Sequence, residues 1–304
     1  MRILVTGGTG FVGSNIANAL AREGHDVWVT GSMHERPLPG FEGKILYTGI
    51  MGIDWDRVGQ IDAVLHQGAI SDTRVHDRAE MLRANFETSK AVFEYAAGHG
   101  CKHIVYASST AVYGVLPPPY KEDGPVAPVN VYGESKVLVD EYAKTFAQAH
   151  PDIAVVGLRY CNVYGPGEAY KGKTSTMIYQ FAQQMLKGNP KLFEHGEQRR
   201  DYIYIKDVVR ANMLALEAKT SGLFNCGSGT ATTFNDIVVL LNQTLGLNRM
   251  SEYIPNPYSA SEYQSYTQCD ISQIQEKLGF TPSYDIASGI KDYFESGELV
   301  DKNR

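Results

Sequence analysis

Tyr132 and Lys136 are the side chains in this sequence whose types and spacing could do acid–base chemistry. Residues four apart lie one turn apart on one face of a helix, and the mostly apolar run over 137–146 predicts such a helix. Because an ammonium stabilises a phenolate, we expect Lys136 to lower the pKa of Tyr132 from its usual value of about 10. Such a tyrosine could take a proton from an alcohol while a hydride leaves the same carbon. The alternative is a surface helix along which the lysine stem extends.

A glycine-rich turn stands near the start of the chain. The apolar, β-branched run 2–6 predicts a buried strand, and residues 14–23 carry apolar side chains at helical spacing. Between them, Gly7 permits a tight turn, Gly10 lets the backbone approach a pyrophosphate, and Gly13 lets the helix pack on the strand. The free amides and partial positive charge of a helix N-terminus attract phosphates. The order strand, turn, helix therefore predicts a dinucleotide-binding unit.

The residues after the second predicted strand, 26–30, bear on the choice of dinucleotide. Many dinucleotide sites place an acid here to hold the adenosine ribose. No acid stands at 30–33, whereas Ser32, His34 and Arg36 are nearby. A small hydroxyl and a cation suit a 2′-phosphate, so the sequence favours NADP over NAD, unless Arg36 is a solvated loop residue.

Further apolar runs predict strands at 44–47, 63–66, 103–107 and 154–159. Helical patterns alternate with them, which indicates an α/β fold with a doubly wound parallel sheet of the Rossmann type. Ligands of such sheets bind beyond the carboxyl ends of strands, where Gly68 and Ser109 follow two of these runs. A helix is expected over 79–99, and its internal Asn85 either contacts the cofactor or makes a structural hydrogen bond.

The alternation of strands and helices gives way to a mixed pattern after Pro166. We therefore expect an NAD(P)-binding domain at 1–165 and a smaller, mixed α/β substrate domain at 166–304. Segments at about 200–230 are expected to return to the first domain.

Composition excludes several classes of function. The net charge is −6 with no block of basic residues, so we expect no nucleic-acid partner. No apolar run is long enough for a membrane span, and a strand that begins at Arg2 leaves no room for a secretion signal. The four cysteines stand singly and the eight histidines form no ligand motif, which fits a reducing cytoplasm and predicts no metal site.

Five motifs together resemble the extended short-chain dehydrogenases/reductases that act on nucleotide sugars. They are the glycines at 7, 10 and 13, the run Ser108-Ser109-x-Ala111-Val112-Tyr113-Gly114, the Tyr132-x-x-x-Lys136 pair, and the runs 159–166 and 200–204. The resemblance covers most of the chain. It implies that Tyr132 is the catalytic base, that Lys136 orients the ribose and lowers the tyrosine pKa, and that Ser109 holds the reacting oxygen.

Other segments are similar to the ADP-glyceromanno-heptose 6-epimerases within that family. They are His66-x-Gly68-Ala69-x-Ser71-x-Thr73, Tyr170-Lys171-Gly172, Pro190-Lys191-Leu192-Phe193-Glu194, Glu252-Tyr253-Ile254-Pro255 and Tyr263-Gln264-x-x-Thr267-Gln268. In that subfamily a loop lysine is the second acid/base, which implies this role for Lys171. Inverting a carbon needs proton transfers associated with opposite faces, so two such groups are required. A phosphate-binding lysine is the alternative for Lys171.

The same resemblance implies the remaining binding residues. The cofactor would contact Gly7, Gly10, Phe11, Val12, Gly13, Ser32, Arg36, Gln67, Gly68, Ala69, Asn85, Lys136 and Val163. The sugar nucleotide would contact Ser71, Asn162, Lys173, Phe193, Glu194, Arg200 and Tyr263. We expect a nucleotide-diphosphate sugar as substrate and a homo-oligomer as the assembly.

The sequence departs from the 6-epimerase pattern at a few positions. Gly31 and Ser32 stand where Asp-Asn is usual, and Gly167, Lys173 and Gln180 replace an arginine, a serine and a histidine. The last three fall where sugar and phosphates should bind, so the sugar and the nucleoside stay open.

Three rival functions share this pattern of residues. A UDP-sugar 4-epimerase needs the same serine, tyrosine and lysine, and a reductase would consume NADPH stoichiometrically. A 4,6-dehydratase needs Asp-Glu where Thr110-Ala111 stands, which argues against it. A rival of another class is a non-catalytic NADP-binding regulator, but such a protein would not require Tyr132 and Lys136.

Overall fold

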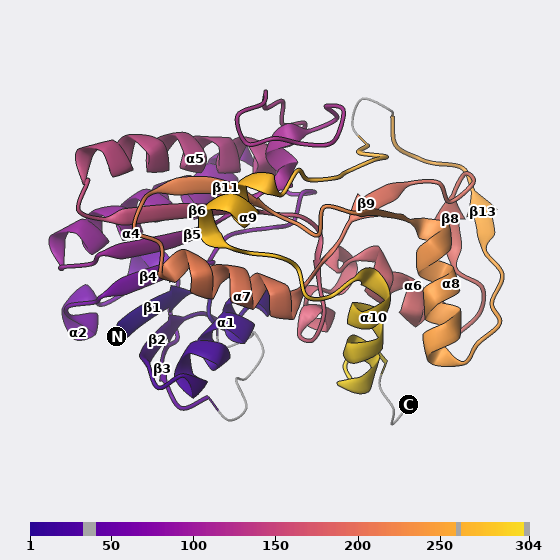
Figure 1. The fold of residues 1–304 in the computed structure, drawn as a ribbon, viewed down its shortest axis with the longest axis horizontal. Helices are drawn as coiled ribbons and strands as arrows, with labels where there is room; N and C mark the ends of the chain where they lie inside the picture. Colours follow the sequence, from indigo (N-terminus) through magenta and orange to yellow (C-terminus); the bar gives the residue numbers. More distant parts are fainter. Residues whose placement is uncertain (33–40, 260–262, 301–304) are drawn as a thin grey trace.

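A seven-stranded parallel sheet forms the centre of the molecule in the computed structural model, which describes residues 1–32, 41–259 and 263–300 (Figure 1). Its strand order is β11-β6-β5-β4-β1-β2-β3, and every neighbouring pair is parallel. The strands are β1 (Arg2–Thr6), β2 (Asp26–Thr30), β3 (Lys44–Leu46), β4 (Ala63–His66), β5 (His103–Ser109), β6 (Ala154–Tyr160) and β11 (Gly222–Cys226). The α/β, doubly wound parallel fold predicted from the sequence is confirmed.

Helices cover both faces of this sheet. The helices α1 (Phe11–Arg22) and α7 (Ile205–Leu216) pack on one face, and α4 (Thr88–Gly98) and α5 (Val131–Ala149) pack on the other. Successive side chains of a strand alternate between these layers. Ile3 and Val5 join the core beneath α1, whereas Leu4 joins the core beneath α4 and α5. Because both layers are apolar, the strands read as continuous hydrophobic runs.

The helix predicted over 79–99 is interrupted by a wider turn. It consists of α3 (Arg78–Leu82), a π-helical turn η2 (Arg83–Glu87) and α4. Asn85 lies within the π turn and is buried. Turns of this kind inside helices are frequent at functional sites, and periodicity alone does not reveal them.

A smaller group of elements lies beside the carboxyl edge of the sheet, at the right of Figure 1. Its helices are α6 (Met177–Met185), α8 (Phe234–Leu245) and α10 (Ile286–Glu295). Its strands pair as β8 (Lys191–Phe193) with β13 (Glu252–Ile254) and β9 (Arg199–Asp201) with β12 (Ala231–Thr233). Both α7 and β11 belong to the large sheet layer, although in sequence they lie between β9 and β12 of this smaller group. The division at residue 165 stays a prediction.

Short elements connect these layers. They are η1 (Ile50–Gly52), α2 (Trp55–Val58), η3 (Thr110–Tyr113), β7 (Val163–Tyr164), η4 (Glu168–Thr174), β10 (Ile203–Tyr204) and α9 (Ser272–Leu278). The loops after β1, β4, β5 and β6 converge at the carboxyl edge, because the carboxyl ends of parallel strands share one edge. Within the three described ranges, no helix combines the length and apolarity that crossing a membrane requires.

Candidate active site

A cleft of about 1370 Å³ opens at the carboxyl edge of the sheet. Most residues that the sequence assigned to a site line it: Gly7, Gly10, Phe11, Val12, Gly13, Ser32, Gln67, Gly68, Ala69, Ser71, Ser109, Tyr132, Lys136, Asn162, Val163 and Lys171. The lining also includes residues that the sequence reasoning missed: Thr9, Tyr47, Ile50, Met51, Tyr160 and Gln264. The volume exceeds that of a typical small-molecule site and accommodates a dinucleotide together with a second ligand.

The glycine turn leaves no room for side chains. At Gly13 a Cβ would lie 2.2 Å from the Gly7 carbonyl oxygen, and at Gly7, whose φ is +63°, a Cβ would lie 2.6 Å from the Gly68 Cα. Gly10 precedes α1 and offers no side chain to cap its first amides. These amides and the helix dipole therefore face the cleft without a protein partner, which fits the pyrophosphate of a dinucleotide.

The end of β2 has no space for an acidic side chain. A Cβ at Gly31 would lie 1.8 Å from Thr9 Oγ1, so the threonine fills the place from which an aspartate would extend. Ser32 follows, exposed and in the lining of the cleft. Arg36, the cation expected beside it, lies outside the described residues. Packing around Gly31 therefore explains why no acidic residue stands at this position.

Ser109, Tyr132 and Lys136 come together from two neighbouring elements. Ser109 ends β5, and Tyr132 and Lys136 lie in the first two turns of α5. Asn130 begins that helix, since its side chain accepts a hydrogen bond from the Gly133 amide at 2.8 Å. The Lys136 Nζ donates to the Ala107 carbonyl oxygen at 2.8 Å and lies 5.9 Å from the centroid of the Tyr132 ring.

The pKa of Tyr132 differs from the expectation. Burial raises it above the usual phenol value, and a hydrogen bond with Ser109 lowers it only in part. The predicted lowering by Lys136 is wrong for this arrangement, because the loss of water around the phenol dominates and Lys136 is not among the causes of the shift. Ser109 is therefore the group that favours phenolate in the structure.

Burial also changes Lys136 itself. It is 4% exposed, and burial lowers the pKa of its ammonium to about 8, opposed by the charge of Asp140. Asp140 lies one turn further along α5 and accepts a hydrogen bond from Arg159 Nε at 2.9 Å. Both side chains of this ion pair are nearly inaccessible. The pair fixes α5 against β6, from which Arg159 projects.

Asn85 is not among the described residues that line the cleft. Its side chain instead makes hydrogen bonds within the protein, chiefly to backbone groups. Its Oδ1 accepts from the Ile70 amide at 2.8 Å, and its Nδ2 donates to the Ile70 carbonyl and to Ser135 Oγ, both at 3.0 Å. Ser135 Oγ donates in turn to the Tyr132 carbonyl oxygen at 2.7 Å. The structure thus favours the structural alternative for Asn85, which connects the loop after β4 to the first turn of α5.

Gln67 is held by partners from distant parts of the chain. Its Oε1 accepts from the Tyr160 hydroxyl at 3.0 Å, and its Nε2 donates to Asn212 Oδ1 at 3.2 Å. Asn212 comes from α7, in the second half of the chain. No pattern in the sequence identifies Asn212 as a partner of Gln67, because the two residues meet only when α7 packs on the large sheet.

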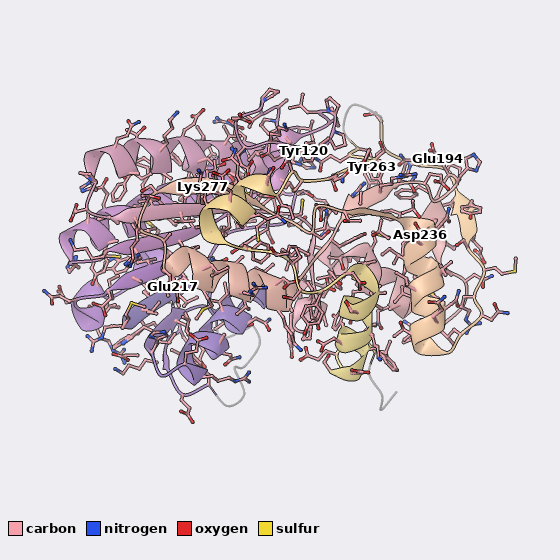
Figure 2. All side chains as sticks on the ribbon, in the orientation of Figure 1. Tyr120, Glu194, Glu217, Asp236, Tyr263 and Lys277 are labelled. Carbon is pink, nitrogen blue, oxygen red and sulfur yellow. The ribbon has the colours of Figure 1, made fainter. Side chains whose placement is uncertain are left out.

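The predicted substrate residues Phe193, Glu194, Arg200 and Tyr263 form a second group, outside the lining of the cleft. Figure 2 labels two of them, Glu194 and Tyr263, at the same end of the molecule. The Arg200 guanidinium lies 5.3 Å from the Tyr263 ring centroid, and the Phe193 and Tyr263 rings meet edge to face at 6.0 Å. Glu194 is exposed and has a φ of 51°, an unfavourable conformation for a residue other than glycine. Lys173 is exposed and belongs to neither group.

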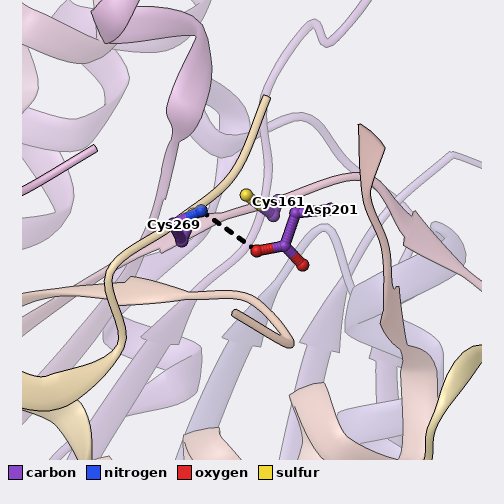
Figure 3. A group of neighbouring side chains, drawn as sticks. All are labelled: Cys161, Asp201 and Cys269. Atoms are coloured by element: carbon purple, nitrogen blue, oxygen red, sulfur yellow. Dashed lines mark hydrogen bonds between the residues drawn. The ribbon is translucent and has the colours of Figure 1, made fainter. Parts of the chain in front are cut away.

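Two of the cysteines lie together, contrary to the impression given by their spacing (Figure 3). The Cys161 and Cys269 sulfurs and an Asp201 carboxylate oxygen lie within 4.8 Å of one another, and all three residues are buried. The Asp201 carboxylate already accepts hydrogen bonds from the amides of Ser228, Gly229 and Cys269. The carboxylate therefore holds the turn after β11 in place. The absence of a metal site stays a prediction.

A glycine turn with free helix amides at one end of the cleft and a serine, tyrosine and lysine at the other define a short-chain dehydrogenase/reductase. A sequence profile of the NAD dependent epimerase/dehydratase family matches residues 3–227, and the chain belongs to that family.

Known proteins agree with this assignment. The chain is 36% identical to the ADP-L-glycero-D-manno-heptose-6-epimerase of Alkalilimnicola ehrlichii, with 97% of each chain covered. The crystal structure of the Helicobacter pylori ADP-L-glycero-D-manno-heptose-6-epimerase is similar, with 37% identity, a TM-score of 0.87 and 97% and 95% of the two chains covered. A UDP-N-acetylglucosamine 4-epimerase from Methanobrevibacter ruminantium has 27% identity, a TM-score of 0.89 and 97% of each chain covered. The predicted resemblance and epimerase class are confirmed.

Proposed function

We propose that the protein is a nucleotide-sugar epimerase that inverts carbon 6 of an ADP-linked heptose. The observation that carries the proposal is that two side chains of a type able to transfer protons, Tyr132 and Lys171, line one cleft from opposite sides of the sheet. Tyr132 belongs to α5, which covers one face, whereas Lys171 lies in η4, which contacts α1 on the other face. The similarity to two 6-epimerases over nearly the whole chain supports the choice of sugar.

The residues of the chain would handle the proton while the sugar carbon changes configuration. A bound nicotinamide would supply hydride acceptance and return, with no net consumption. Tyr132 would hold the hydroxyl proton of one epimer, with Ser109 hydrogen-bonded to its phenol. Lys171 would do the same for the other epimer, while Lys136 would position the ribose. The glycine turn would fix the pyrophosphate, and Arg200 would bind the substrate diphosphate.

We propose NADP as the preferred dinucleotide. The support is the packing of Thr9 against Gly31, which leaves no room for an acidic side chain at residue 31, and the exposed Ser32 in the lining of the cleft. Mass spectrometry of the dinucleotide released from the purified protein tests this, and release of NAD alone would contradict it. We further propose a homo-oligomer in the cytoplasm, which light scattering and cell fractionation would test.

The test of the epimerase proposal uses single variants and NMR detection of both heptose epimers. Tyr132→Phe and Lys171→Met should each lower the rate by about 10²- to 10⁴-fold, the usual contribution of a general acid or base. Both variants should still bind the dinucleotide, because neither side chain forms the glycine turn. Epimerisation by Tyr132→Phe at the wild-type rate would refute the assignment.

A UDP-sugar 4-epimerase is the second candidate. The replacements Gly167 and Lys173 alter the loop that should contact sugar and phosphates, and Gln180 alters α6 beside it. The 4-epimerase structure superposes as well as the 6-epimerase structure does. Parallel assays with ADP-heptose, UDP-glucose and UDP-N-acetylglucosamine distinguish the two. Turnover of the UDP sugars alone would establish the second candidate.

A further inference from the structure

Glu168 is a fully buried carboxylic acid in the loop that carries Lys171, and the chemistry described above makes no use of it. Its exposed fraction is 0%. Its Oε2 accepts from the Thr176 amide at 3.0 Å, and its Oε1 accepts from the Thr176 hydroxyl at 3.2 Å and from the Gly165 amide at 3.4 Å. One carboxylate thus connects the beginning of the loop, residue 165, to its end at residue 176.

The loop itself has little regular structure. Within η4, Gly172 has a φ of 54°, and Gly167 before it has a φ of 99°. Thr176 is the residue immediately before α6, at its N-cap position, and its side chain does not cap that helix. The Glu168 carboxylate accepts the amide at this position and lies near the positive end of the α6 dipole. The loop conformation therefore depends on the glutamate side chain.

The charge of this carboxylate is coupled to the charge of Lys171. It also contributes to raising the pKa values of Tyr164, Tyr202 and Tyr293. Burial raises the pKa of Glu168 to about 7, while the Thr176 hydrogen bonds and the charge of Lys171 lower it. Burial likewise lowers the pKa of Lys171, and the charge of Glu168 raises it. Each side chain stabilises the charged form of the other.

The place of Lys171 makes this coupling relevant to the reaction. Its Nζ lies 6.0 Å from the centroid of the Phe11 ring, in the first turn of α1, and both residues line the cleft. The lysine thus lies beside the first turn of α1, in the same loop as the buried glutamate and three residues after it. A proton taken up at this Nζ creates a cation in a poorly hydrated place, where a carboxylate is the strongest available stabilising group.

We propose that Glu168 is the positioning residue and charge partner of Lys171: it closes the loop that presents the lysine and stabilises the ammonium formed when Lys171 accepts a substrate proton. This inference rests on the proposed role of Lys171 as the second acid/base. In the step concerned, the substrate O–H bond breaks, the proton forms an N–H bond on Lys171, and Glu168 stays a carboxylate. On reversal the proton returns to the sugar oxygen.

The experiment compares Glu168→Gln with a matched control. Glutamine keeps the size of the side chain and one acceptor oxygen but removes the charge. The control is Glu298→Gln, because Glu298 accepts a hydrogen bond from the Gly167 amide at 2.8 Å in the same loop but is not among the main causes of the Lys171 or the Glu168 pKa shift. Glu168→Asp, which keeps the charge on a shorter side chain, provides a second variant if glutamine prevents folding.

The first readout needs no substrate. The rate of acetic anhydride labelling of Lys171, followed by mass spectrometry across pH 6–10, gives the apparent pKa of its ammonium. Loss of the carboxylate should lower that pKa by about one unit in Glu168→Gln, which corresponds to about tenfold faster labelling at a fixed pH below it. Glu298→Gln should label like the wild type. An unchanged labelling profile in a folded Glu168→Gln protein would overturn the inference.

The second readout is turnover of the sugar that the wild type epimerises. We expect kcat to fall about 10- to 100-fold in Glu168→Gln with KM within about threefold, which is less than the loss of Lys171 itself should cause. Glu168→Asp should recover part of kcat. An equal fall in Glu298→Gln would indicate a general loop defect and overturn the proposal. A labelling shift in a protein that epimerises no sugar would support the charge pairing but refute the proposed function.

Discussion

Gly13→Ala provides a test of the glycine turn whose size follows from the structure. The new Cβ would lie 2.2 Å from the Gly7 carbonyl oxygen, 2.8 Å from the Gly7 carbonyl carbon and 3.0 Å from the Gly8 Cα. All three atoms belong to the backbone, so no side-chain rotation relieves the contact. Ordinary contacts between such atoms are about 3.5 Å, and α1 must therefore move away from the turn by about 1 Å.

Two measurable losses should follow from that movement. Overpacking of a well-packed site costs about 1–3 kcal/mol, and at about 2 °C per kcal/mol for a chain of this size the melting temperature should fall by about 2–6 °C. The amides at the start of α1 would also move relative to the turn. Because a displacement of about 1 Å can cost about 100-fold at a preorganised site, dinucleotide affinity should fall by at least about tenfold.

The assay combines thermal unfolding without ligand and titration calorimetry with NAD and NADP. Gly98→Ala is the matched control, since Gly98 is the last residue of α4 and a Cβ there meets no atom within 4 Å. The control should bind the dinucleotide normally and unfold at the same or a slightly higher temperature. If Gly13→Ala matched the control in both measurements, our account of the turn as a phosphate site would be wrong.

Three further predictions concern buried polar groups. Lys136→Met should stabilise the ligand-free protein by about 1–2 kcal/mol at pH 7 while abolishing turnover, because burial holds the Lys136 pKa near 8, below its value in the unfolded chain. The unfolded chain then binds more protons, so wild-type stability relative to this variant should rise between about pH 8 and pH 10. Urea titrations in which the free energy of unfolding of the wild type falls relative to that of the variant over this range would contradict this. Asn85→Ala should cost about 1–3 kcal/mol of stability, because the Ile70 amide and carbonyl lose their partner. The same change should weaken dinucleotide binding, and an unchanged affinity in calorimetry would contradict the role of Asn85 in positioning the loop after β4. Burial raises the pKa of all four buried thiols, that of Cys101 to about 11, so Ellman's reagent should label them no faster than the protein unfolds; rapid labelling of any of them in the folded protein would count against the structure.

Local patterns in the sequence were sufficient for the large sheet and for one side of the site. Apolar runs such as 2–6 and 103–107 predicted its strands, because residues buried on both faces must be apolar. The Tyr132 and Lys136 spacing predicted their shared face of α5, since helical geometry is local. The glycines at 7 and 13 could also be interpreted, because their positions follow directly from the strand and the helix they join.

Other features depended on contacts between distant segments. The lower tyrosine pKa expected from Lys136 did not hold, because burial around Tyr132 is a property of the assembled cleft. Asn85 was ambiguous until the Ile70 backbone supplied its partners. The proximity of the Cys161 and Cys269 sulfurs could not be predicted, because the two residues are more than a hundred positions apart in the sequence.

The sequence by itself determined the parallel α/β sheet, the dinucleotide turn and the serine, tyrosine and lysine of the cleft, because each depends on geometry within a few residues. Only the tertiary structure decided which of the remaining polar groups face the cleft and how strongly they are charged. Desolvation and charge pairing depend on everything that surrounds a group. For Glu168 and Lys171, that environment exists only once the loop between β7 and α6 has packed against α1.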